Sequence, residues 1–242
     1  MVYFISDLHL GIQERSLDKL REDLLLDFLK KIDGDCETLF ILGDLFDFWF
    51  EYKQVVPKYF YRTLAALAEL TKSGKKVEYL MGNHDFGHID FFEKELNITV
   101  YKEDITREIN GKKFYLSHGD GKSYKDRLYK LMKKILRSPI NLRLYLALHP
   151  DFGIALASSS SKSSRAYTDT KDYGNIEGME EFAKTIINEG FDYVIMGHRH
   201  KIIDIDFGKG RYINIGEWID NPSFARFDGN DVQVLSVKDF LS

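Results

Sequence analysis

Five short polar clusters, each directly after an apolar run of strand length, constrain the fold of this 242-residue chain more than any other feature. The clusters are Asp7-Leu8-His9, Gly43-Asp44-Leu45-Phe46-Asp47, Gly82-Asn83-His84-Asp85, His118-Gly119-Asp120 and Gly197-His198-Arg199-His200. In open α/β folds the carboxyl ends of the strands meet at one edge, and ligands bind there. We therefore expect the five clusters to converge on a single site.

The N-terminal third alternates between expected strands and expected helices. Strands are expected at 2–6, 38–42 and 76–81, with helices at about 16–32 and 57–72 between them. Ser16 is expected to cap the first helix, whose apolar positions recur at helical spacing: Leu20, Leu24, Phe28 and Ile32. Strand, helix, strand, helix, strand is typical of a parallel sheet covered on both faces.

The later part of the chain predicts a second sheet. A hairpin is expected across Asn110-Gly111, because this dipeptide favours tight turns between strands. A helix at about 177–188 is followed by expected strands at 191–196, 202–206 and 212–215 and by a hairpin across Asp228-Gly229. The whole chain, 1–242, is therefore predicted to form one α/β domain of two packed sheets with helices outside.

Residues 121–168 depart from this pattern and predict an inserted helical cap. Ten Lys or Arg residues stand against two acids between Lys122 and Arg165, so this segment carries +8 in a chain whose total is −4. A first helix, ended by Ser138-Pro139, places apolar residues on one face: Tyr124, Leu128, Leu131, Met132, Ile135 and Leu136. The alternative is an ordinary insertion whose apolar face packs on the core. The serine-rich segment 158–164 is as typical of a flexible polar linker as of a loop that binds phosphate.

Composition indicates a soluble, cytoplasmic protein. Cys36 is the only cysteine, which excludes an internal disulfide and suits a reducing compartment. No signal peptide is visible at the N-terminus. The most apolar segment, 142–157, is interrupted by charged residues, whereas a bilayer span needs roughly 20 mostly apolar residues. The net charge of −4 gives no general reason to expect nucleic acid as a partner.

The clusters together offer seven nitrogen and oxygen donors: Asp7, His9, Asp44, Asn83, His118, His198 and His200. Seven donors are too many for one ion and suit two divalent ions that share a carboxylate. Two ions about 3.5–4 Å apart clamp the attacking and leaving oxygens of a phosphoryl displacement. No thiolate belongs to the set, which disfavours structural zinc and leaves Mn, Fe, Zn or Mg open.

A lone histidine near a strand end is more often a structural residue than a ligand. Five of the seven histidines nevertheless lie inside the clusters, and such a concentration favours a metal site. For His88 and His149, outside the clusters, the structural interpretation stands. Asp47 and Asp120 are expected to support the site by accepting hydrogen bonds from ligand histidines or backbone N–H groups.

The five motifs, in this order, resemble those of the calcineurin-like metallophosphoesterase superfamily. The resemblance implies a four-layer α/β/β/α sandwich with the helical cap inserted, and a two-metal site bridged by Asp44. By motif position the ions would be held by two sets of side chains: Asp7, His9 and His200, and Asn83, His118 and His198. A hydroxide activated by both ions would attack phosphorus in line. His84 would stabilise developing charge or protonate the leaving oxygen, with Asp85 orienting it.

The basic cap after His118 also resembles that of the UDP-2,3-diacylglucosamine hydrolases of lipid A biosynthesis, as does the Ser160-Ser161-Lys162-Ser163 segment. This resemblance implies Mn²⁺-dependent cleavage of a UDP-linked lipid to UMP and 2,3-diacylglucosamine 1-phosphate. Lys162 and Tyr129 match substrate-binding positions. The cap would meet the inner face of the bacterial cytoplasmic membrane peripherally, its basic residues near anionic headgroups.

Two other functions stay open from the sequence. The best-known diacylglucosamine hydrolases carry Arg at the position of His84, and histidine is the choice of the broader superfamily. The same site would therefore also suit a phosphodiesterase or nucleotide pyrophosphatase that acts on a soluble substrate. A metal-binding scaffold without catalysis is the third possibility, against which the retained His84 argues.

Overall fold

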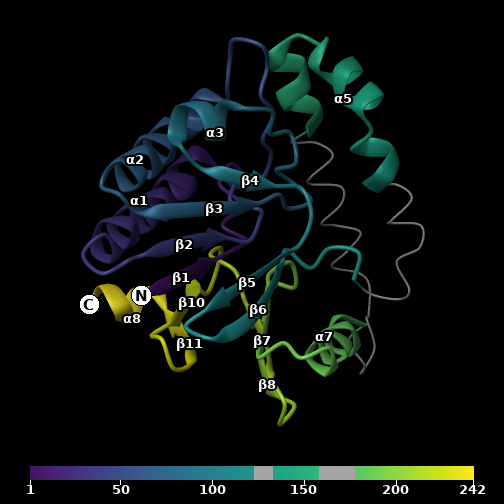
Figure 1. Ribbon diagram of the computed structural model, residues 1–242. Helices are drawn as coiled ribbons and strands as arrows, with labels where there is room; N and C mark the ends of the chain where they lie inside the picture. The colour runs from purple at the N-terminus through teal and green to yellow at the C-terminus, as the bar shows by residue number, and fades with distance from the viewer. Residues whose placement is uncertain (123–132, 158–177) are drawn as a thin grey trace.

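The computed structural model describes residues 1–122, 133–157 and 178–242, which form two sheets packed face to face (Figure 1). The six-stranded sheet contains, in order, β11 (Val232–Ser236), β10 (Ser223–Phe227), β1 (Val2–Ile5), β2 (Thr38–Ile41), β3 (Lys76–Leu80) and β4 (Thr99–Tyr101). The five-stranded sheet contains, in order, β5 (Ile105–Ile109), β6 (Lys112–Ser117), β7 (Tyr193–Met196), β9 (Arg211–Ile215) and β8 (Ile202–Asp206).

Helices cover the outer face of each sheet. The six-stranded sheet packs against α1 (Arg15–Ile32), α2 (Tyr61–Lys72), α3 (Phe91–Leu96) and α8 (Val237–Leu241), and the short 3₁₀ turn η1 (Lys58–Phe60) precedes α2. The five-stranded sheet packs against α7 (Gly178–Asn188). The predicted four-layer α/β/β/α architecture is therefore confirmed.

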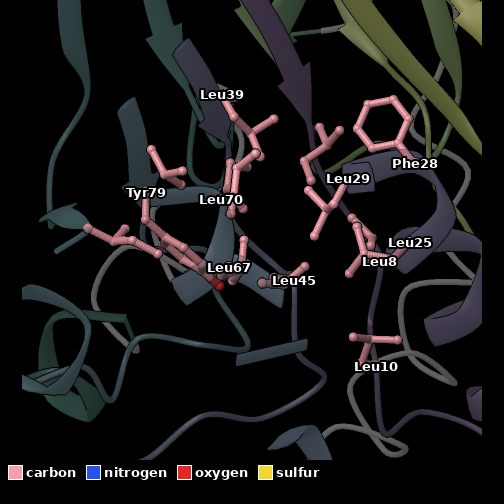
Figure 2. Packing of buried hydrophobic residues seen from close by; sticks show 14 of the residues in the cluster. Leu8, Leu10, Leu25, Phe28, Leu29, Leu39, Leu45, Leu67, Leu70 and Tyr79 are labelled. Carbon is pink, nitrogen blue, oxygen red and sulfur yellow. The ribbon is translucent and has the colours of Figure 1, made fainter. Parts of the chain in front are cut away.

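The strands next to the site are apolar on both faces because both faces are covered. In β1, Val2 and Phe4 pack between the two sheets, whereas Tyr3 and Ile5 face the helices. Figure 2 shows the helix side of this core, where Phe28 and Leu29 of α1 lie near the strands. A sheet buried in this way gives the loops at its edge a rigid base.

Parallel pairing brings the five polar clusters to the same end of the molecule. Strands β1, β2 and β3 are parallel neighbours, and β6 is parallel to β7. Each cluster begins within two residues of the carboxyl end of one of these strands. The convergence expected from the sequence therefore follows from strand direction within each sheet and from the packing of the two sheets on each other.

The start of α1 differs from its prediction. The helix begins at Arg15 without a side-chain cap, so Ser16 lies in its first turn, and Leu20 is 65% exposed. The buried residues at this end are polar instead: Asp18, Arg21 and Glu22. Arg21 donates to the carbonyl oxygen of His9 at 3.2 Å, so the N-terminal end of α1 holds a loop of the site, while its later turns pack into the apolar core.

Turn chemistry was predicted more accurately. Asn110 and Gly111 join β5 to β6 with φ values of 50° and 74°, which is the pattern of the tight hairpin turn that Asn-Gly favours. Elements that the sequence did not indicate are α3, β4 and α8. They are short, at six, three and five residues, so their periodicity carries little signal.

The described part of the predicted cap is helical. It contains α5 (Pro139–Leu146) and further helical residues at 133–136 and 150–157, beside the edge that carries the clusters (Figure 1). Tyr145 packs on Phe50 with ring centroids 4.2 Å apart, and Ile154 and Ala157 join the core on the helix side. The boundaries at 121 and 168 stay predictions, since 123–132 and 158–177 lie outside the described residues.

Much apolar surface of the cap stays uncovered. At least half of the side chain is exposed in each of six apolar residues, and the exposed fraction of Phe152 reaches 74%: Ile135, Leu136, Ile140, Leu144, Phe152 and Leu156. The alternative in which the apolar face of the cap packs fully on the core therefore fails for Ile135 and Leu136. Among the described residues, no helix combines the length and apolar character required to cross a bilayer.

Candidate metal centre

Five of the expected ligands adopt left-handed backbone conformations, with φ of 56° at Asp7, 48° at His9, 53° at Asp44, 72° at His198 and 53° at His200. Non-glycine residues rarely adopt them, although Asp and His tolerate them best. Such conformations cost on the order of 1 kcal/mol or more each, persist only where the surroundings fix them, and cluster at functional sites. Here the N–H groups of Asp7 and His9 donate to the carbonyls of Gly43 and Asp44.

The first group of donors consists of Asp7, His9 and His200. The Nε2 atoms of the two histidines lie 3.0 Å apart, and Oδ1 of Asp7 lies 3.2 Å from Nε2 of His200 and 3.7 Å from Nε2 of His9. Oδ2 of Asp7 accepts hydrogen bonds from Ser6 Oγ and the backbone N–H of His198. Oδ1 is buried and accepts no hydrogen bond from any residue that the structure describes, which fits a cation among these three residues.

The second group of donors is centred on His118. Its Nδ1 lies 2.8 Å from the carbonyl oxygen of Leu42, which fixes the ring, and its Nε2 lies 2.9 Å from Asn83 Oδ1. The ring of His198 lies 5.1 Å from that of His118, measured between centroids. A histidine held through Nδ1 presents Nε2 as a ligand atom, the usual arrangement around protein-bound metals.

Asp44 lies between the two groups. Its Oδ2 is 3.3 Å from Nε2 of His118 and 3.6 Å from Nε2 of His9, while Oδ1 accepts from the backbone N–H of His84 at 2.9 Å. The side chain is buried. One carboxylate that faces both groups is the geometry a bridging ligand requires, so the donor set fits two ions.

The electrostatics of the site favour bound positive charge. Burial alone would lower the pKa of His9, but the carboxylates of Asp47, Asp7 and Asp44 raise it to about 10. In the same way Asp44 and Asp7 outweigh burial and raise the pKa of His118 to about 10. His198 differs, because burial and the neighbouring His118 lower its pKa to about 4. The carboxylates thus attract cations, whether protons or metal ions.

His84 stands at the edge of this set. Its Nδ1 lies 3.3 Å from the carbonyl oxygen and 3.6 Å from Oδ1 of Asp47, and its ring meets the ring of His9 edge to face. His84 also forms a possible ligand group with His9 and Asp44. The position of His84 is thus compatible with two roles, a general acid beside the metals or a further metal ligand. The metal content of a His84 variant distinguishes them.

The three supporting aspartates differ in what they contact. Asp47 lies 3.5 Å from Nδ1 of His9, as well as near His84. Asp85 is buried and binds Tyr79 and the backbone N–H groups of Leu45, Phe46 and Gly82, so it shapes the loops rather than the ring of His84. Asp120 has partners that the sequence did not predict, the cap residues Lys133 and Arg137. Tyr129 and Lys162 lie outside the described residues.

Further residues of the site were missed in the sequence. Ser6 donates to Asp7, and Asn214 Nδ2 donates to the carbonyl oxygen of Gly197 at 2.5 Å. Asn214 is buried in β9 among apolar neighbours. A polar residue inside an apolar strand often has a specific partner, so Asn214 could have been predicted to support the site. For Ser6 the sequence offers no such indication beyond its position next to Asp7.

Gly197 offers a steric test of the first donor group. A Cβ at this position would lie 1.9 Å from Ser6 Oγ and 2.3 Å from Asp7 Oδ2, so Gly197→Ala must displace the carboxylate. We expect metal affinity to fall roughly 10- to 100-fold, as for other losses of ligand support. Titration of the metal-stripped protein with Mn²⁺ measures this, and Gly34→Ala, where a Cβ has open space, is the control. Equal affinities in both variants would contradict the placement of Asp7.

A model of the calcineurin-like phosphoesterase family matches residues 1–201. The chain belongs to this family. It is 35% identical, over an alignment 257 positions long, to a UDP-2,3-diacylglucosamine hydrolase of Porphyromonas gingivalis, with 98% of each chain covered. It is 30% identical to a UDP-2,3-diacylglucosamine hydrolase of Pseudomonas aeruginosa, with 90% of each chain covered. A solved archaeal phosphodiesterase covers 97% of this chain and 98% of its own at 12% identity and a TM-score of 0.48.

Membership of the family agrees with the chemistry of the site. The calcineurin-like phosphoesterase fold described here places Asp and His groups that suit metal ions at the carboxyl edge of its strands. The protein is therefore a metal-dependent phosphoesterase.

Proposed function

We propose that this phosphoesterase hydrolyses the pyrophosphate of UDP-2,3-diacylglucosamine to UMP and 2,3-diacylglucosamine 1-phosphate. The observation that carries the proposal is the similarity to the Porphyromonas gingivalis hydrolase over 98% of both chains. An alignment of that extent includes the cap as well as the motifs of the metal site. Similarity confined to the motifs would have supported only the broader activity.

Asp7, His9 and His200 would hold one ion, Asn83, His118 and His198 would hold the other, and Asp44 would be shared between them. Divalent ions, Mn²⁺ by resemblance, would supply an activated water and neutralise charge on the phosphoryl oxygens. Asp47 keeps the rings of His9 and His84 oriented. His84 donates a proton to the leaving oxygen or stabilises the charge that develops on it.

The cap would take the lipid part of the substrate. Acyl chains require apolar surface, and exposed side chains such as Ile140, Leu144 and Phe152 offer it beside the metal site. Tyr129 and Lys162 are proposed to bind the substrate by motif position. We further propose that the protein works in the cytoplasm, with the cap against the inner face of the cytoplasmic membrane.

Isotope labelling tests the substrate and the point of attack together. Purified protein with Mn²⁺ and UDP-2,3-diacylglucosamine in ¹⁸O-water should release UMP that carries one labelled oxygen, because attack is proposed at the uridine-side phosphorus. Mass spectrometry of both products locates the label. Label found only in the lipid phosphate would contradict the point of attack, and absence of turnover would contradict the substrate.

A second candidate is a phosphodiesterase or nucleotide pyrophosphatase that acts on a soluble substrate. The observation that favours it is His84, which stands where the best-known diacylglucosamine hydrolases have arginine. The same assay decides between the two candidates. Small nucleotide diphosphates turned over as fast as the lipid substrate would support the soluble alternative.

A further inference from the structure

We propose that Arg137 of the cap is a positioning residue that holds the loop of Asn83 and His84 in its working geometry. Its Nη2 donates to the carbonyl oxygen of Gly82 at 2.6 Å, directly before Asn83. The side chain is only 18% exposed, so this contact is largely shielded from water. A charged donor on a shielded carbonyl forms one of the stronger hydrogen bonds available to a protein.

The guanidinium also contacts two other parts of the molecule. It lies over the ring of Phe86 at 5.2 Å from the centroid, and Nη2 lies 3.5 Å from Oδ2 of Asp120. Phe86 and Gly82 belong to the loop after β3, in the six-stranded sheet, and Asp120 to the loop after β6, in the five-stranded sheet. Arg137 therefore ties the cap to loops of both sheets at once.

The contact on Gly82 matters because this residue packs against the proposed bridging ligand. A Cβ on Gly82 would lie 2.1 Å from Asp44 Oδ1, so the loop and the carboxylate touch with no room between them. The same oxygen accepts the backbone N–H of His84. A small shift of the loop would therefore move His84, Asn83 and Asp44 together, and displacements of about 1 Å can cost on the order of 10²-fold in rate.

Lys133 provides a matched comparison within the same cap. Its Nζ lies 2.6 Å from Oδ2 of Asp120, whereas Nη2 of Arg137 lies 3.5 Å from the same oxygen. Lys133 and Arg137 therefore share the carboxylate of Asp120. Lys133 pairs with Asp120, whereas the hydrogen bond to the carbonyl oxygen of Gly82 comes from Arg137. Removing Lys133 thus removes a cap cation and an ion pair while the contact to the loop of Asn83 stays.

The inference rests on the proposed roles of Asn83 and His84, but not on the identity of the lipid substrate. Its test therefore uses bis(p-nitrophenyl) phosphate, a small diester without acyl chains, and the Mn²⁺ content of the protein. If the wild type cleaves this diester and not the lipid, the proposed substrate fails while the comparison of variants still decides the role of Arg137.

The experiment compares Arg137→Ala, Arg137→Lys and Lys133→Ala in the full chain. For Arg137→Ala we expect kcat on the small diester to fall roughly 10- to 100-fold with little change in KM, as for lost ligand support. Millimolar guanidinium should restore part of that activity, Arg137→Lys should fall between, and Lys133→Ala should stay near wild type. Thermal unfolding of each variant shows whether it is folded at the assay temperature.

Three results would overturn the proposal. The first is an unchanged kcat in folded Arg137→Ala, and the second is an equal loss in Lys133→Ala, which would reduce the role to the ion pair with Asp120. The third is a loss in Arg137→Ala that guanidinium does not restore and that matches a lower unfolding temperature, which would make the residue merely structural. Should Arg137→Ala fail to fold, the Arg137→Lys variant carries the same comparison.

Discussion

Replacing Asp44 with alanine should abolish hydrolysis and leave fewer than two metal ions on each chain. Oδ2 of Asp44 faces His118 on one side and His9 on the other, so its removal takes a ligand from both proposed ions. Metal ions contribute several kcal/mol to phosphoryl transfer, and each 1.36 kcal/mol is tenfold in rate, so we expect a loss of roughly 10³-fold or more. Metal analysis and steady-state kinetics on the same sample measure both effects.

Two further variants control for folding and for charge. Asp44→Asn keeps the shape of the side chain and an acceptor for the N–H of His84, yet it lacks the charge that a bridging ligand needs. It should remain folded and inactive. Asp27→Ala removes an exposed carboxylate of α1 and should leave activity unchanged. Two bound ions with full turnover in Asp44→Ala would contradict the bridging role.

Replacing His84 with alanine should slow the reaction by roughly 10²- to 10⁴-fold while both ions stay bound, the range expected for loss of a general acid. The imidazole is oriented by Asp47 and lies beside His9 without being needed to complete either proposed set of ligands. Metal content and kcat, measured together, separate the two possible roles. His149→Ala, an exposed histidine of the cap, is the matched control.

Either of two outcomes would change this assignment. Loss of one ion from His84→Ala would make His84 a ligand, which its grouping with His9 and Asp44 permits. Retention of full activity would remove His84 from the chemistry altogether. In neither case would the seven proposed ligands lose a member.

Much of the fold could be predicted from the chain because its strands are short apolar runs that end in turns. The alternation of strands with helices was enough to predict that β1, β2 and β3 are parallel. The dipeptide Asn110-Gly111 was enough to predict the hairpin turn. The start of α1 was misjudged because Leu20 fits a helical apolar face, while the structure buries Asp18, Arg21 and Glu22 there instead. Periodicity cannot distinguish an apolar face from a buried polar one.

For the site, motif order predicted which polar side chains lie together but not the contacts that hold them. Motif order identified Asp7 and Asp44 as candidate ligands. No local sequence pattern could show that Ser6 and the backbone N–H of His198 both donate to one oxygen of Asp7. Arg137 is separated from Gly82 by 55 residues, so their contact depends on how the cap docks. Such pairings arise only from tertiary structure.

We propose that two metal ions bound at this site are required for cleavage of a UDP-linked lipid. The most direct measurement is to strip the protein of metal, titrate it with Mn²⁺ and follow UMP release from UDP-2,3-diacylglucosamine. We predict no release without metal and full activity when two ions are bound per chain. Full activity in the stripped protein, or none on this substrate at full metal occupancy, would contradict the claim.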